Sequence, residues 1–282
     1  MIKSLGKTDF DTLFTAFNAA FRDYEMQVNR HELSVMLQRR GFNAELSFGA
    51  FEDEKLVSFT FNGTGFFNGI KTAYDTGTGT LEEFRGRGLA TKIFEHSLPF
   101  LKQNGIGQYL LEVLQHNTKA INVYKKLGFK VSREFSYFVQ DADKVLVSAH
   151  LLPSKYVIRE IDLGRKQEMV LFWDFTPSWQ NSFEAILRRP DDFIKIGVFD
   201  HAKLVGYGIL EPYSGDITQI AVSKDYRRQG IGSGIFNELL KFNKFRTVKA
   251  VNVEISCTSL KLFLVSKNIP EKGKQFEMIR EL

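Results

Sequence analysis

Apolar residues near the start of the chain recur at helical spacing. Between Phe10 and Phe21 they follow an i, i+3, i+4, i+7 pattern, which predicts one face of an amphipathic helix. Residues 31–40 predict a second, shorter helix, because Gly41 follows them and glycine commonly ends a helix. Both helices precede the first of the predicted strands.

Farther along, short apolar runs predict strands, and two helical segments lie between them. Gly105 and Gly128 follow these helical segments, and Asn117 is a suitable N-cap for the second. Pro99 lies within the first and is expected to kink or break it. The expected strands are 47–51, 56–61, 73–81, 109–114, 130–139 and 144–151, and the expected helices are 87–104 and 117–127.

The chain repeats itself at low similarity. Residues 48–57 align with 196–205, and residues 84–90 align with 226–232. The first pair of segments is offset by 148 residues and the second by 142. The difference fits a longer segment in the first copy, at 62–75, which is rich in glycine. A repeat this long indicates duplicated domains rather than a solenoid. We therefore expect domains at 1–152 and 153–282, joined near Pro153.

The second copy repeats the order of elements. Helices are expected at 164–173, 180–189 and 231–244, and strands at 194–199, 205–210, 217–222 and 248–255. Helices that alternate with strands in both copies predict a layered α/β (α+β) fold.

Composition narrows the class of protein. The 282 residues are 43% hydrophobic and 25% charged, which is typical of a soluble globular chain of two domains. The single cysteine, Cys257, cannot form an internal disulfide. We find neither a secretion signal nor an apolar run of roughly 18–20 residues, so a cytoplasmic protein without a membrane partner is expected.

Charge and histidine spacing give no support to a nucleic-acid site or a metal site. The net charge of +5 lies mostly in the second half, but neither half has the dense basic block of a nucleic-acid-binding protein, and a nucleic-acid role for the second half stays a distant alternative. The five histidines show no metal-ligand spacing, so we expect neither a metal site nor a nucleic-acid partner.

A glycine-rich turn after the third expected strand predicts an anion site. The strand ends in Thr76-Gly-Thr-Gly-Thr80, and Arg85-Gly-Arg-Gly-Leu-Ala90 leads into a helix. Small residues let a ligand approach the backbone, and the first amides of a helix point outward as donors. The turn lacks the Lys-Ser/Thr of a nucleotide P-loop and the full dinucleotide pattern. A pyrophosphate suits it.

The segment that follows makes this site more specific. It reads Leu-Glu-Val and then Asn117-x-x-Ala-x-x-x-Tyr124-x-x-x-Gly-Phe. Together with Arg85-x-x-Gly88-x-Ala90, this pattern resembles the GCN5-related N-acetyltransferase (GNAT) superfamily. The resemblance implies two tandem acyl-CoA N-acyltransferase domains, each a mixed, mostly antiparallel sheet flanked by helices. The spacing of Glu112, Asn117 and Tyr124 is similar to that of acetyltransferases acting on ribosomal-protein N-termini.

The resemblance assigns acetyl-CoA to the first copy. Backbone groups of the Thr-Gly strand are expected to meet the pantetheine arm, and the loop amides the pyrophosphate. The expected cofactor-binding residues are Thr78, Thr80, Arg85, Arg87, Gly88, Leu89, Ala90 and Asn117.

The second copy keeps the loop but departs from the second motif. Arg227-x-x-Gly230-x-Gly232 matches the loop, whereas Cys257 and Leu264 stand where Asn and Tyr are expected. We therefore expect a catalytic first domain and a degenerate second domain that retains a second cofactor loop.

Acetyl transfer to an amine requires a base for the amine and an acid for the leaving thiolate. Tyr124 is the candidate acid, because a phenol is protonated at neutral pH; the alternative is a core tyrosine. Glu112 lies in an apolar strand and so needs a partner, a wet cleft or a raised pKa. It is the candidate base, directly or through water, or else makes a structural hydrogen bond. Asp75, Glu82 and Glu83 are weaker candidates, because acids near a loop are usually solvated.

The predicted function is an acetyl-CoA-dependent N-acetyltransferase that acts by direct transfer in a ternary complex. The alternative is a non-catalytic acyl-CoA-binding module. A small-molecule amine, a protein N-terminus or a lysine could be the acceptor, and the oligomeric state is open. Tyr24, Phe66, Phe67 and Tyr74 could line the acceptor pocket, and each is equally compatible with core packing.

Overall fold

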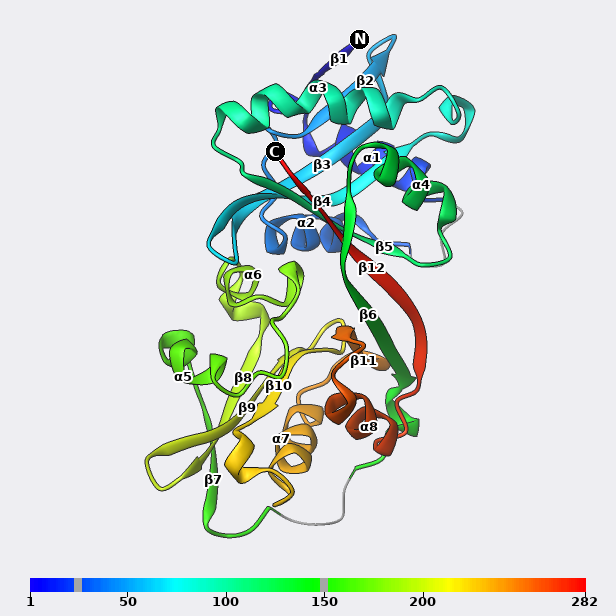
Figure 1. Ribbon diagram of the computed structural model, residues 1–282. Helices are drawn as coiled ribbons and strands as arrows, with labels where there is room; N and C mark the ends of the chain where they lie inside the picture. The colour runs from blue at the N-terminus through cyan, green and yellow to red at the C-terminus, as the bar shows by residue number, and fades with distance from the viewer. Residues whose placement is uncertain (23–26, 148–151) are drawn as a thin grey trace. The chain divides into compact units, whose positions relative to one another are not determined.

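The computed structural model describes residues 1–22, 27–147 and 152–282 (Figure 1). By contacts the chain forms two compact units. The first unit comprises Met1–Ser132 together with Phe276–Leu282, and the second comprises Arg133–Gln275. The boundary expected at 152/153 lies inside the second unit. No helix of the described residues is long and apolar enough to cross a membrane.

The first unit is a mixed sheet with helices on both faces. The strand order is β1-β2-β3-β4-β5, followed by the end of β12, and only β4 and β5 run parallel among the first five. Its strands are β1 (Ile2–Ser4), β2 (Phe48–Glu52), β3 (Lys55–Phe67), β4 (Ile70–Thr80), β5 (Gln108–Leu114) and the end of β12 (Glu271–Glu281), and its helices are α1 (Phe10–Ala20), α2 (Arg30–Arg39), α3 (Leu89–Gln103) and α4 (Thr118–Lys126).

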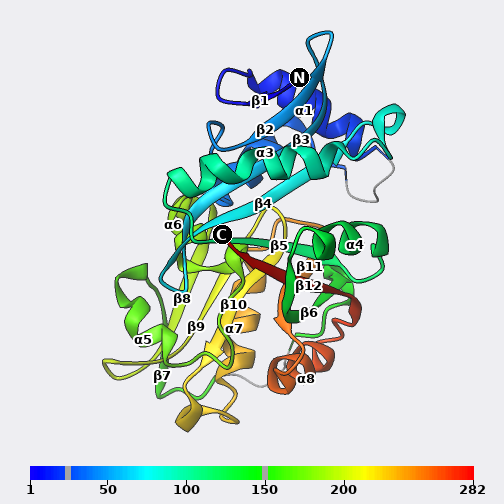
Figure 2. The same cartoon turned by 45° about the horizontal axis from the view of Figure 1, so that its top comes forward.

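The two faces of this sheet have separate cores. Phe59 and Phe61 of β3 pack among the apolar residues of α1 and α2. Tyr109 and Leu111 of β5 pack with α3 and α4 through Phe94 and Ile121, and α3 lies across the strands in Figure 2. Because side chains alternate along a strand, neighbouring residues of β4 and β5 face different helices.

The expected excursion at 62–75 is an extension of two strands. Strands β3 and β4 continue as a hairpin to Phe67 and Ile70. At its tip, Asn68 and Gly69 have φ of 51° and 78°, the positive values that a tight hairpin turn requires and that Asn-Gly adopts readily. The extra residues of the first copy therefore lengthen a hairpin.

Helix α3 continues through Pro99 to Gln103, so the expected break is absent. Phe94 and Leu101, on either side of the proline, are at most 4% exposed. Their burial offsets the backbone hydrogen bond that proline cannot donate.

The second unit repeats the layout of the first. Its strand order is β6-β11-β10-β9-β8-β7, with β10 and β11 parallel. The strands are β6 (Lys130–Asp141), β7 (Tyr156–Glu160), β8 (Ile194–Asp200), β9 (Lys203–Glu211), β10 (Asp216–Val222) and β11 (Thr247–Glu254), and the helices are α5 (Lys166–Val170), α6 (Phe183–Leu187), α7 (Ile231–Leu240) and α8 (Thr258–Ser266).

Several expectations for the second half differ from the structure. The helices expected at 164–173 and 180–189 each divide into a 3-10 turn and a five-residue α-helix. The strand expected at 144–151 is absent over 144–147, and 148–151 lie outside the described residues. Helix α8 and strand β12 were not expected.

The last strand of the chain changes its unit partway along. Residues of β12 up to Gln275 belong to the second unit, and those from Phe276 belong to the first. There Met278 is fully buried beside α3, β5 and α4. Arg280 Nη1 donates to the Leu127 carbonyl at 2.5 Å, and the Leu282 amide donates to the Gly107 carbonyl at 3.0 Å. The final residues thus complete the first unit.

We predict that Met278→Ala destabilises the first unit by about 2–5 kcal/mol, the usual cost of emptying a fully packed apolar site. Hydrogen exchange at β5 amides in the full chain measures this. Val265→Ala, at a 57% exposed position of α8, is the control and should change little. Faster exchange confined to the second unit would contradict the assignment of this strand end.

Candidate active site

The site begins where two parallel strands separate. The ladder between β4 and β5 ends at the pair Tyr74–Leu110, whereas β4 stays paired with β3 as far as Thr80. A bulge leaves Thr76 without an opposite residue between Asp75 and Gly77. Beyond this point, polar groups on β4 face a gap rather than a neighbouring strand.

The loop after β4 carries the start of α3 to this gap. Gly86 and Gly88 have φ of 77° and 69°, and Gly88 is the N-cap residue of α3. Only glycine adopts this conformation without strain. The first amides of α3, at Leu89 and Ala90, have no partner within the helix and lie at its positive end. The loop residues before them are exposed, so the turn can accept an anion.

Both arginines of the loop donate hydrogen bonds to nearby backbone carbonyls. The Arg85 guanidinium donates to the carbonyls of Thr80, at 3.2 Å, and Ala20, at 3.0 Å. Arg87 donates to the Glu83 carbonyl at 3.0 Å. These bonds fix the loop against β4 and the end of α1, so Arg85 braces the turn.

The threonine side chains of β4 bond to their own sheet. Thr78 Oγ1 donates to Asp75 Oδ2 at 2.7 Å, and the hydroxyls of Thr80 and Ser58 share a hydrogen bond of 2.8 Å. A ligand in the gap would therefore meet the backbone of this strand, as the sequence predicts.

Helix α4 brings a phenol to the same gap. Asn117 caps the helix, and its Oδ1 accepts the Ala120 amide at 3.2 Å. Two turns later, Tyr124 packs edge-on against Phe129, with 5.6 Å between ring centroids, and its hydroxyl donates to Asp75 Oδ2 at 3.2 Å. Tyr124 is thus held by both apolar packing and a carboxyl.

Asp75 is more central than the sequence suggests. Besides Thr78 and Tyr124, the Gly77 amide donates to its Oδ1 at 2.9 Å. Burial is the largest influence and raises the pKa of Asp75 above the ordinary value, although these hydrogen bonds oppose it. The available signal was its position on the strand, directly before Thr-Gly-Thr-Gly-Thr, rather than in the solvated loop.

Glu112 lies on the other face of the sheet. It shares that face of β5 with Leu110, the partner of Tyr74. The buried phenol of Tyr74 is hydrogen-bonded to Glu112, and burial, together with the charge of Glu112, raises the pKa of Tyr74 well above the ordinary value. Arg40, at the end of α2, donates to the Thr76 carbonyl at 3.1 Å nearby. The candidate base and acid therefore approach the gap from opposite faces.

The residues suggested for the acceptor pocket do not form one surface. Phe67 and Tyr74 are buried, whereas Phe66 is 63% exposed near the hairpin turn. Tyr24 lies outside the described residues.

The second unit repeats this backbone geometry. Strands β10 and β11 pair only at Asp216–Lys249, and a bulge leaves Thr218 unpaired with β9. Gly230, with φ of 81°, is the N-cap residue of α7. Arg227 braces the loop as Arg85 does, donating to the carbonyls of Val222 at 3.1 Å and Phe172 at 3.3 Å.

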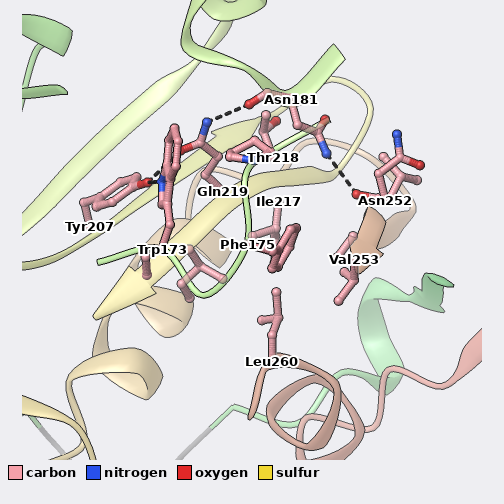
Figure 3. Close-up of a pocket in the computed structure, with 15 residues that line it drawn as sticks. Trp173, Phe175, Asn181, Tyr207, Ile217, Thr218, Gln219, Asn252, Val253 and Leu260 are labelled. Carbon is pink, nitrogen blue, oxygen red and sulfur yellow. Dashed lines mark hydrogen bonds between the residues drawn. The ribbon is translucent and has the colours of Figure 1, made fainter. Parts of the chain in front are cut away.

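A small cavity lies between β10 and β11 (Figure 3). Trp173 Nε1 donates to the Tyr207 hydroxyl at 2.5 Å, which donates to Gln219 Oε1 at 2.6 Å. Gln219 Nε2 in turn donates to the Asn181 carbonyl at 2.6 Å. The described residues that line the cavity carry no charge, so it suits an uncharged, largely apolar group.

The reactive side chains of the first unit are replaced in the second. Counting from the matched bulges, Ile217 occupies the place of Asp75. Along the matched helices, Cys257 and Leu264 occupy the places of Asn117 and Tyr124. These helices are offset by 140 residues, and the same offset places Asn252 at the position of Glu112. The second unit therefore keeps the gap and lacks the side chains that are the candidate acid and base of the first.

Within the described residues, no group of three or more His, Cys, Asp or Glu side chains is placed to hold a metal ion.

Comparison with known proteins agrees with this geometry. The model of the acetyltransferase (GNAT) family matches residues 11–129 and 158–258, one region in each copy. N-alpha-acetyltransferase 30 of Schizosaccharomyces pombe is 28% identical over 101 residues, which are 35% of this chain and 67% of that protein. An N-alpha-acetyltransferase of Sulfurisphaera tokodaii is 30% identical over 81 residues, which are 28% of this chain and about half (48%) of that protein.

Solved structures with the same fold include a tandem protein. A tandem GNAT protein from the clavulanic acid biosynthesis pathway superposes with a TM-score of 0.76 at 13% identity, over 100% of this chain and 98% of its own. A GCN5-related N-acetyltransferase from Sphaerobacter thermophilus gives 0.72 at 13% identity, over 100% and 95%. At these identities the likeness shows the fold.

We predict that Gly88→Ala destabilises the chain by about 1–2 kcal/mol, because its φ is left-handed while the added carbon would meet no atom within 4 Å. Gly232→Ala, inside α7 with ordinary contacts, is the matched control and should be neutral or stabilising by up to about 1 kcal/mol. Urea unfolding measures both variants. Equal effects would show that backbone conformation does not set the requirement for Gly88.

Proposed function

Since this chain belongs to the acetyltransferase (GNAT) family, we propose that it is an acetyl-CoA-dependent N-acetyltransferase whose first unit carries out the transfer. The observation that supports this most directly is the hydrogen bond from Tyr124 to Asp75 beside the gap between β4 and β5. It holds a proton donor next to a strand and a loop that suit a pantetheine diphosphate.

The residues of the first unit fit acetyl-CoA as co-substrate. The amides of residues 87–90 would receive the diphosphate, and residues 76–80 of β4 would offer backbone donors and acceptors to the pantetheine amides. Asn117 would add a contact from the start of α4, besides capping it. A backbone amide of this strand is also the natural donor to the oxyanion that forms during transfer.

The two faces of the sheet then divide the proton chemistry. An amine must be neutral to attack a thioester, and Glu112, or a water that it holds, would accept its proton. From the other face, Tyr124 would donate to the sulfur as the carbon–sulfur bond breaks. The only cysteine, Cys257, is 6% exposed and belongs to the second unit. This supports direct transfer rather than an acyl-cysteine intermediate.

The acceptor we propose is a primary amine. Similarity to two N-alpha-acetyltransferases supports a protein N-terminus within this class, and a lysine or a small-molecule amine is the alternative. An amine panel assayed by release of free thiol distinguishes them.

A second candidate function applies to the second unit. Its cavity and its loop at Arg227, Gly230 and Gly232 persist, whereas the acid and base are replaced. This supports a non-catalytic acyl-CoA-binding module within the same chain.

We predict that Tyr124→Phe lowers kcat by roughly 10²–10⁴, because the proton for the leaving thiolate is lost. Affinity for coenzyme A, measured by equilibrium dialysis, should stay nearly unchanged. Tyr213→Phe, at a 66% exposed position, is the control. An unaltered rate for Tyr124→Phe would remove this residue from the mechanism.

If the second unit binds acyl-CoA, the full chain should take up about two equivalents of coenzyme A in dialysis. Arg228→Glu places a negative charge on the second loop, where residue 228 is exposed, and should abolish one equivalent while turnover persists. Arg87→Glu should instead raise KM for acetyl-CoA. Uptake of a single equivalent by the unmodified chain would exclude the second site.

A further inference from the structure

The carboxyl of Asp75 is fixed by its own strand and aimed at a neighbouring helix. The Gly77 amide holds Oδ1, and the Thr78 hydroxyl holds Oδ2. The remaining bond, from Tyr124, reaches from α4 to the same Oδ2 at 3.2 Å. Asp75 and Tyr124 both keep part of their surface exposed. The phenol therefore points its proton at a carboxyl that two hydrogen bonds from its own strand hold in place.

The internal repeat shows that the fold does not need this pair. The second unit forms the same bulge at Thr218 and a matching helix, α8. In the places of Asp75 and Tyr124 it has Ile217 and Leu264, which are 4% and 0% exposed in one apolar core. Both members of the pair are replaced together by side chains that only pack. A structural role alone does not explain why the first unit keeps a partly buried acid there.

The groups around the pair set its protonation. Arg40, from α2, lowers the pKa of Asp75, but burial dominates and raises it. Tyr109, from β5, has its own pKa raised by burial and by the charges of Asp75 and Tyr124. Tyr74 and Glu112 form a separate hydrogen-bonded pair on the other face. The pKa of Asp75 is therefore raised overall, so its carboxyl stays protonated up to a higher pH than that of an ordinary aspartic acid.

We propose that Asp75 is the positioning residue that returns a proton to Tyr124 in each catalytic cycle. This rests on the proposed function, in which Tyr124 is the acid. As the thiol S–H bond forms, the O–H bond of Tyr124 breaks. The phenolate then takes the proton of the Asp75 carboxyl, and a hydronium ion from solvent reprotonates the carboxylate. One proton leaves the amine to Glu112 or water, and one reaches the sulfur, so the protons balance.

The experiment compares pH profiles of kcat in the full chain. The unmodified protein should lose activity with rising pH as the Asp75 carboxyl deprotonates, because the relay requires its acid form. Asp75→Asn keeps the size of the side chain and one oxygen that can accept the Gly77 amide, but removes the carboxyl proton. We expect kcat to fall about 10–100-fold and this limb of the profile to vanish, with KM for acetyl-CoA within about threefold.

Two further variants make the result decisive. Tyr213→Phe removes an exposed phenol of the second unit and should keep both the rate and the limb. Asp75→Ala opens space at the carboxyl, so added formate should restore part of kcat at acidic pH, where some of it is formic acid and can return a proton. This test also serves if Asp75→Asn folds poorly. A normal kcat and an intact limb in Asp75→Asn, or a lack of formate rescue, overturns the relay.

The relay and the proposed function fail in different ways. If Tyr124→Phe is slow but Asp75→Asn is normal, only the relay is wrong. If the unmodified chain releases no thiol from acetyl-CoA with any amine, the proposed function is wrong.

Discussion

The parting of two parallel strands is the constraint on which this structure depends. Once the β4–β5 ladder ends at Tyr74, the backbone of β4 beyond it has β3 on one side only. In a closed sheet those groups would bond to a neighbour, and the proposed binding of a cofactor in the gap depends on their availability. The bulge at Thr76 fixes where the strands part, and the glycine turn fixes where α3 begins. Every proposed role in the first unit follows from these two points.

Comparison of the two units distinguishes the features that the backbone provides from those that the side chains provide. Both have a bulge, a braced loop and a helix that begins at a left-handed glycine. Asp75, Glu112 and Tyr124 of the first unit are ionisable, whereas none of the residues at the matched positions of the second unit is. A fold can therefore persist while its chemistry is lost, because packing tolerates Ile217 and Leu264 where a reaction would not.

Local sequence patterns predicted much of the secondary structure, whereas contacts between distant parts of the chain could not be predicted from them. The Phe10–Phe21 periodicity, the Asn117 cap and the left-handed Gly88 express short-range preferences, and the structure confirms α1, α3 and α4 close to their expected bounds. The partnership of Asp75 with Tyr124 joins residues 49 positions apart. Likewise, nothing near Met278 in the sequence shows which core it enters. Such contacts depend on the whole topology, so neither periodicity nor spacing reveals them.

The return of the last residues to the first unit affects how the protein is made. The ribosome synthesises the chain from its N-terminus. The sheet around Tyr109 therefore lacks residues 276–282 until the whole second unit has been synthesised. The unit that contains Tyr124 and Glu112 is therefore completed only after the second unit has been made, although its synthesis begins first. Its newly made sheet edge beside β5 stays uncovered during that interval, when it could pair with other nascent chains.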